Sequence, residues 1–208
     1  MEKSVYSLVL MDDVVAAVDV LAYRSGTSRS NMINRILAEY LDFQTPEQRI
    51  EAIFQHITQQ IPREGLLRIR EQDSDTMLSV HSALQTRYNP TLRYNLELYP
   101  TGEELGQLRV TLRSQNRGLL DFLTLFFTAW HRMECRRQPN TRGEVGDGRY
   151  TRQLRRVQES NESPGEAITR YIAGMDTVLK AVLRAYQRDE DPATAFSQKL
   201  SHIELPLL

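Results

Sequence analysis

Residues 4–33 of this 208-residue chain read SVYSLVLMDDVVAAVDVLAYRSGTSRSNMI, and they decide the fold of its N-terminal part. Residues 4–10 are rich in β-branched and aromatic side chains, which predicts a short strand. Asp12 and Asp13 then open a helix whose apolar residues recur at helical spacing. Gly26 suits the position after its last turn, because a left-handed φ costs glycine little. Ser28 is a good N-cap for a second helix.

A strand and two helices of this size leave their apolar faces uncovered and one strand edge unpaired. The pattern therefore favours a homodimer, in which two copies of the strand pair antiparallel and four helices interlock. The apolar residues on these faces are Tyr6, Leu8 and Leu10 in the strand, Val14, Val18, Leu21 and Ala22 in the first helix, and Met32 and Ile33 in the second.

With these residues, and with the stretch from Gly26 to Ile33, residues 1–43 resemble the ribbon-helix-helix family of DNA-binding proteins, the MetJ, Arc and CopG class. The resemblance implies that the paired strands enter the major groove of double-stranded DNA and read base edges with outward side chains. It implies contacts from Val5, Ser7 and Val9, with Lys3 close to the DNA. It also implies that a phosphate binds at the start of the second helix, at Thr27, Ser28, Arg29, Ser30 and Asn31.

Residues 44–208 predict a second domain, for oligomerisation or sensing. Residues 45–48 (TPEQ) form a capping box, so 44–62 is a candidate linking helix. The apolar period is two over residues 76–84, 92–98 and 108–112, and the last two segments are expected to pair. Helices are expected at 118–137, 150–159, 164–189 and 192–201, with a loop at 138–148. The predicted fold class is α+β: the ribbon-helix-helix unit, then an antiparallel sheet of three or four strands packed with helices.

Charge is unevenly distributed, although the net charge is only −1. Residues 1–43 carry −2, whereas residues 132–156 carry +5. Four arginines in or next to the expected helix 150–159 are spaced to share one helical face: Arg149, Arg152, Arg155 and Arg156. They are candidate accessory phosphate contacts. The favoured interpretation is a solvated helix beside a flexible loop, paired with acidic neighbours such as Glu159.

Other site chemistries have little support in the sequence. His131 and Cys135 are spaced for two metal ligands on one helix, but the remaining histidines are scattered, so no metal site and no cofactor are predicted. The aromatic run of Phe122, Phe126, Phe127 and Trp130 is typical of a core helix, with an apolar ligand pocket as the alternative. No phosphate loop, nucleophile elbow or HExxH motif is present, so we do not expect an enzyme.

The sequence thus predicts a cytoplasmic, sequence-specific transcriptional regulator, most simply a repressor, associated with the nucleoid when bound to DNA. It has no signal peptide pattern and no apolar stretch of membrane-spanning length. The expected partners are double-stranded DNA and further copies of the chain, in dimers or tetramers, while a small-molecule or protein effector stays open. The alternative is a protein-interaction module, such as an antitoxin-like or plasmid-maintenance protein, in which DNA binding is secondary.

Overall fold

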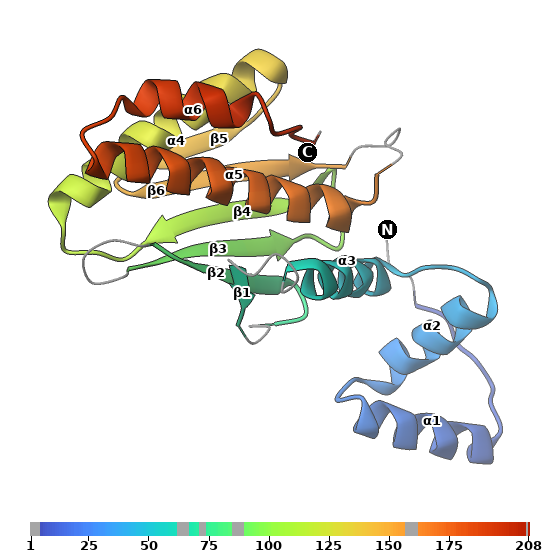
Figure 1. The fold of residues 1–208 in the computed structure, drawn as a ribbon. Helices are drawn as coiled ribbons and strands as arrows, with labels where there is room; N and C mark the ends of the chain where they lie inside the picture. The colour runs from blue at the N-terminus through green and yellow to red at the C-terminus, as the bar shows by residue number, and fades with distance from the viewer. Residues whose placement is uncertain (1–4, 62–66, 71–73, 85–89, 157–161, 207) are drawn as a thin grey trace. The chain divides into compact units, whose positions relative to one another are not determined.

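The structure is a computed structural model that describes residues 5–61, 67–70, 74–84, 90–156, 162–206 and 208. The chain divides into two compact units, Met1–Arg49 and Ile50–Leu208. The described residues form six helices and six strands, coloured along the chain in Figure 1. The predicted α+β class is confirmed.

The N-terminal unit contains α1 (Asp12–Arg24) and α2 (Arg29–Tyr40). Its buried cluster is small: Val18, Ala22 and Met32, with Ile33 partly buried beside them. The expected strand at 4–10 is absent, because the described residues 5–10 have no strand assignment and the unit begins with a helix. The physical reason is that a strand needs a hydrogen-bonding neighbour, and no strand of this unit's described residues offers one.

The capping box predicted at residues 45–48 is formed at the start of α3 (Pro46–Gln60). The Thr45 amide donates to Gln48 Oε1 at 2.9 Å, and the Gln48 amide donates to Thr45 Oγ1 at 3.2 Å. The apolar face of the helix is buried in the core of the C-terminal unit, through Ile50, Ile53, Phe54 and Ile57. From Ile50 onward this helix therefore belongs to that unit.

The C-terminal unit is built on an antiparallel sheet of order β1-β2-β3-β4-β6-β5. Its strands are β1 (Leu67–Ile69), β2 (Met77–Ala83), β3 (Thr91–Leu98), β4 (Glu104–Leu112), β5 (Gly143–Gly146) and β6 (Arg149–Arg155). The expected β3–β4 pairing is confirmed, because Leu92 faces Leu112 and Leu96 faces Leu108. Alternate residues of these strands are buried, as expected for a sheet covered on one face.

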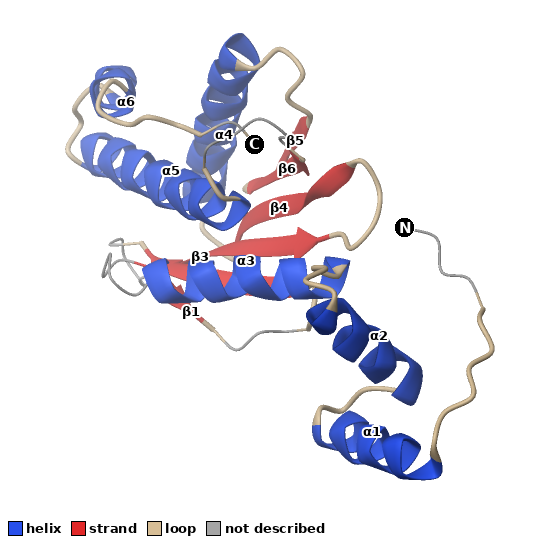
Figure 2. Cartoon of the chain, turned by 90° about the vertical axis from the view of Figure 1, so that its right-hand side faces the viewer, coloured by secondary structure: helices blue, strands red, loops and turns tan. Residues whose placement is uncertain are grey.

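The covered face packs against α4 (Arg117–Arg137) and α5 (Pro164–Gln187), whose buried residues share one core with the strands. Figure 2 shows both helices on the same side of the sheet, with α6 (Pro192–Leu200) outside them. The start of α5 also touches α3, since a Cβ on Gly165 would lie 3.0 Å from His56 Cβ. The aromatic run of α4 is buried in this core, as predicted.

Two expectations about residues 138–159 are wrong. Residues 149–155 form a strand and not a helix, because Tyr150, Arg152 and Leu154 are buried with a period of two. The loop expected at 138–148 contains β5, whose backbone pairs with β6 as the edge of the sheet. These strands, together with β1, enlarge the sheet to six strands instead of three or four.

Candidate nucleic-acid interface

The turn between α1 and α2 brings five of the predicted contact residues together. Gly26 has a φ of +60°, which a glycine adopts without strain, and the Thr27 amide closes the end of α1 by donating to the Ala22 carbonyl at 2.9 Å. Ser28 caps α2, because its Oγ accepts from the Asn31 amide at 3.3 Å. Residues 27–31 thus comprise the end of the turn, the N-cap and the first three residues of α2.

Arg29 is held by a neighbouring carboxylate in this turn. Its Nε and Nη2 donate to the two carboxylate oxygens of Asp19 on α1, each at 2.6 Å. These hydrogen bonds lower the pKa of Asp19, because they favour its charged form. Any anion that approaches Arg29 must therefore compete with Asp19.

The predicted base-reading residues are solvent-exposed in the single chain. Val5 and Val9 are 99% and 103% exposed, and Ser7 between them is also exposed. Lys3 lies outside the described residues. The structure therefore gathers residues 27–31 at the start of α2, but it does not order residues 5, 7 and 9 as a strand.

The four arginines predicted as accessory phosphate contacts do not share a face. Arg149 and Arg155 are exposed on β6, whereas Arg152 is 1% exposed and points into the core. Arg156 donates to the carbonyl oxygens of Tyr99, at 2.7 Å, and Gly102, at 3.2 Å. The prediction is wrong for Arg152, because strand geometry sends its side chain to the covered side of the sheet.

Arg152 belongs to a buried polar network that sequence reasoning missed. Its Nη1 donates to Glu134 of α4 at 2.5 Å, and its Nη2 donates to the Leu208 main-chain oxygen at 3.1 Å. Glu134 also accepts from the Tyr150 hydroxyl at 2.5 Å. The guanidinium lies over the ring of Tyr171, 4.8 Å from its centroid. The sequence contains one sign of this network: Glu134 follows Trp130 by four residues, which places an acid on the apolar face of the helix.

The metal-ligand pair His131 and Cys135 gains no further ligand. Cys135 Sγ lies 3.6 Å from His131 Nε2, and His131 Nδ1 lies 3.2 Å from the Tyr150 hydroxyl. Across the described part of the chain, no group of three or more His, Cys, Asp or Glu side chains is placed to hold a metal ion. The pair is best explained as part of the packing between α4 and β6.

Comparisons of the chain with protein-family models, with curated proteins and with solved structures find no match. Within the ranges that the structure describes, no helix combines the length and the apolar character needed to cross a membrane. The assignment of residues 27–31 as a candidate nucleic-acid interface consequently rests on their geometry and on the resemblance described for residues 1–43.

Proposed function

We propose that the chain is a sequence-specific DNA-binding transcriptional regulator, which acts as a homodimer whose two N-terminal segments pair as a ribbon. The observation that carries this proposal is the uncovered apolar surface of the N-terminal unit. Tyr6, Leu8 and Leu10 are 81%, 63% and 41% exposed. An alternating segment of this kind is stable in water only when a partner covers its apolar side.

The helices of the unit support the same conclusion. Leu21, Ile36 and Leu37 are 44%, 37% and 47% exposed, although each lies in an amphipathic helix. Burying a large aliphatic side chain contributes about 1.5–3 kcal/mol. A second copy that covered these residues would stabilise the dimer by several such increments, which is enough to offset a small monomeric core.

The proposed reading surface consists of the side chains that alternate with the apolar ones. In a paired ribbon, Val5, Ser7 and Val9 face away from the helices and toward the major groove. The Ser7 hydroxyl can donate to or accept from a base edge, and the valines can contact thymine methyl groups. The backbone amides at the start of α2 then grip a phosphate, in the positive field of the helix N-terminus.

A binding experiment tests this proposal. Duplexes are selected from a random pool with the full chain, and the affinity for the selected sequence is compared with that for a shuffled duplex. We expect Val9→Ala and Ser7→Ala to change which sequence is preferred, and Arg29→Ala to weaken all sequences alike. If no sequence is enriched, or if the Val9 and Arg29 variants bind like the wild type, the proposed interface is wrong.

A further inference from the structure

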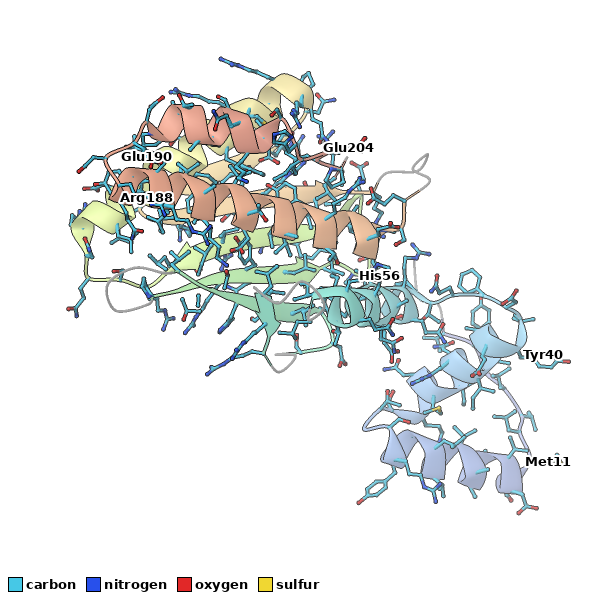
Figure 3. All side chains as sticks on the ribbon, viewed as in Figure 1. Met11, Tyr40, His56, Arg188, Glu190 and Glu204 are labelled. Atoms are coloured by element: carbon cyan, nitrogen blue, oxygen red, sulfur yellow. The ribbon has the colours of Figure 1, made fainter. Side chains whose placement is uncertain are left out.

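The face of the six-stranded sheet that points away from α4 and α5 carries a basic surface that the N-terminal resemblance does not predict. All three long helices of the C-terminal unit contribute to the core on the other face. The strand register aligns the outward side chains in rows that cross the sheet. Figure 3 shows side chains with nitrogen at their tips projecting from the sheet on the side away from α5.

Two adjacent rows hold five arginines. The first row runs through Arg68, His81, Arg93, Thr111 and Arg149 on five neighbouring strands. In the next row, Ser79, Asn95, Arg109, Thr151 and Glu144 are aligned, and Arg70 beyond β1 donates its amide to the Ser79 carbonyl at 3.1 Å. Glu144, at the edge strand, is the only acid in the aligned positions of these two rows. We call Arg68, Arg70, Arg93, Arg109 and Arg149 the sheet arginines.

The sheet arginines are available to a ligand. None of them takes part in a salt bridge among the described residues, whereas Arg142 near the same edge pairs with Glu104 at 3.7 Å. Arg109 and Arg149 line a polar groove of about 690 Å³, whose lining also includes a third arginine, Arg142, and two acids, Glu104 and Glu144. Arginines that share one face and form no ion pair repel one another, and a polyanion relieves that repulsion.

We propose that the sheet arginines bind the phosphate backbone of double-stranded DNA. This inference rests on the proposed function, and it gives the C-terminal unit a share in holding the duplex. Neighbouring strands lie about 4.8 Å apart, so Arg68, Arg93 and Arg149, on alternate strands, are spaced by about 10 Å. Each guanidinium can bond a phosphate with two parallel N–H groups.

The side chains of this face favour a duplex over a single strand. Single-stranded nucleic acids are bound through bases stacked on aromatic rings. The outward positions of the described strands in these two rows contain no Phe, Tyr or Trp. They offer Arg and Thr, which are side chains that contact phosphate and sugar without reading sequence.

The test uses the full chain, the selected duplex and a titration at several salt concentrations. The sheet variant is Arg68→Gln/Arg93→Gln/Arg149→Gln. Its matched control is Arg132→Gln/Arg137→Gln/Arg184→Gln, which removes the same charge from exposed positions on α4 and α5. Each lost phosphate contact reduces the slope of log affinity against log salt by about 0.9, so the sheet variant should lose about 2–3 in slope and at least about tenfold in affinity at 0.1 M salt. The control should keep the wild-type slope.

Further arms separate the ways in which this inference can fail. The variant Arg68→Lys/Arg93→Lys/Arg149→Lys keeps the charge, so it should keep most of the slope even if the glutamine variant folds poorly. If wild type and control bind the selected duplex and the folded glutamine variant binds it equally well, the sheet face has no part in binding, while the proposed function stands. The same variants are also titrated with single-stranded RNA. If the glutamine variant loses affinity for that RNA and keeps its affinity for the duplex, the partner assigned here is wrong. If the wild type binds no duplex selectively, the proposed function itself fails.

Discussion

The guanidinium of Arg152 on β6 lies 2.5 Å from the carboxylate of Glu134 on α4, and both side chains are almost completely buried. Arg152 occupies the sheet row of Leu78, Leu96 and Leu108, where an aliphatic side chain is the usual occupant. Arg152 Nη2 donates to Gln138 Oε1 and to the Leu208 main-chain oxygen, each at 3.1 Å. The contacts of Arg152 therefore join the sheet, α4 and Leu208.

Glu134→Gln should strongly destabilise the C-terminal unit, because it leaves the buried charge of Arg152 without a counter-charge. Removing one partner of a buried pair costs about 3–5 kcal/mol. Urea denaturation of the full chain measures the loss. As a control, Glu134→Leu/Arg152→Met removes both charges and should recover a large part of the stability. If the double variant lost as much stability as the sum of the losses in Glu134→Leu and Arg152→Met measured singly, the two side chains would not be coupled.

Three buried tyrosines should resist ionisation at alkaline pH. Burial raises the pKa of Tyr94, Tyr150 and Tyr171 above the usual value, and nearby Asp176 or Glu134 raises it further. The unfolded chain ionises its tyrosines near pH 10, so the contribution of these groups to stability is complete below that pH and falls as the pH rises above it. The native protein has nine tyrosines, and at about pH 11 its tyrosinate absorbance should lack the contribution of at least these three until cooperative unfolding releases them.

Substitution to phenylalanine checks this assignment. Tyr171→Phe should reduce the delayed absorbance step by one tyrosine and leave the early step unchanged. Tyr23→Phe, at an 89% exposed position, should do the reverse. Simultaneous ionisation of all tyrosines in the folded protein would contradict the packing of this core.

Local signals in the sequence predicted many of the elements correctly, because they depend on neighbouring residues alone. The capping box at Thr45 and the alternation in β3 and β4 are of this kind. β6 was mistaken for a helix because its central inward residue is Arg152, which disguises the period of two. The charge of that residue is tolerated only because Glu134, distant in sequence, lies beside it.

The candidate site was predictable only in part. The arrangement of residues 27–31 depends on Gly26 and Ser28, both of which the sequence identifies. The pairing of Arg29 with Asp19 depends on how two helices pack, so residue spacing gave no signal for it. The basic surface on the sheet was hidden for the same reason, since its arginines are far apart in the chain and only the strand register aligns them.

Gly106→Ala should destabilise the sheet, whereas Gly118→Ala should not. Gly106 on β4 pairs with Leu98 on β3, and a Cβ on Gly106 would lie 2.1 Å from the neighbouring Glu97 carbonyl oxygen. Relieving such an overlap costs about 1–3 kcal/mol. At Gly118, in the first turn of α4, the nearest atom is 3.5 Å away, so alanine should leave stability unchanged or raise it by up to about 1 kcal/mol. Thermal unfolding of both variants measures the contrast, and equal melting temperatures would contradict the register of β3 with β4.

Asp19→Asn should strengthen DNA binding by releasing Arg29 for a phosphate. The low pKa of Asp19 keeps its carboxylate charged at neutral pH, so the wild-type pair is intact there. The variant should bind duplexes more tightly and with a steeper salt dependence. Asp13→Asn, at an exposed position of the same helix, provides a control with the same change in charge. Equal gains in the two variants would assign the effect to net charge and not to Arg29.

The central claim is that residues 5–10 form one half of a two-stranded ribbon, and a cysteine scan tests it most directly. Each of these residues is replaced singly by Cys in a Cys135→Ser background, and the full chain is oxidised with the selected duplex present. In an antiparallel pair only residues beside the two-fold axis face their own copies closely enough for a disulfide. The account predicts a maximum of cross-linked dimer near Ser7→Cys, with yields falling toward Val5→Cys and Leu10→Cys. The absence of dimer at every position, or a uniform yield along the segment, would contradict it.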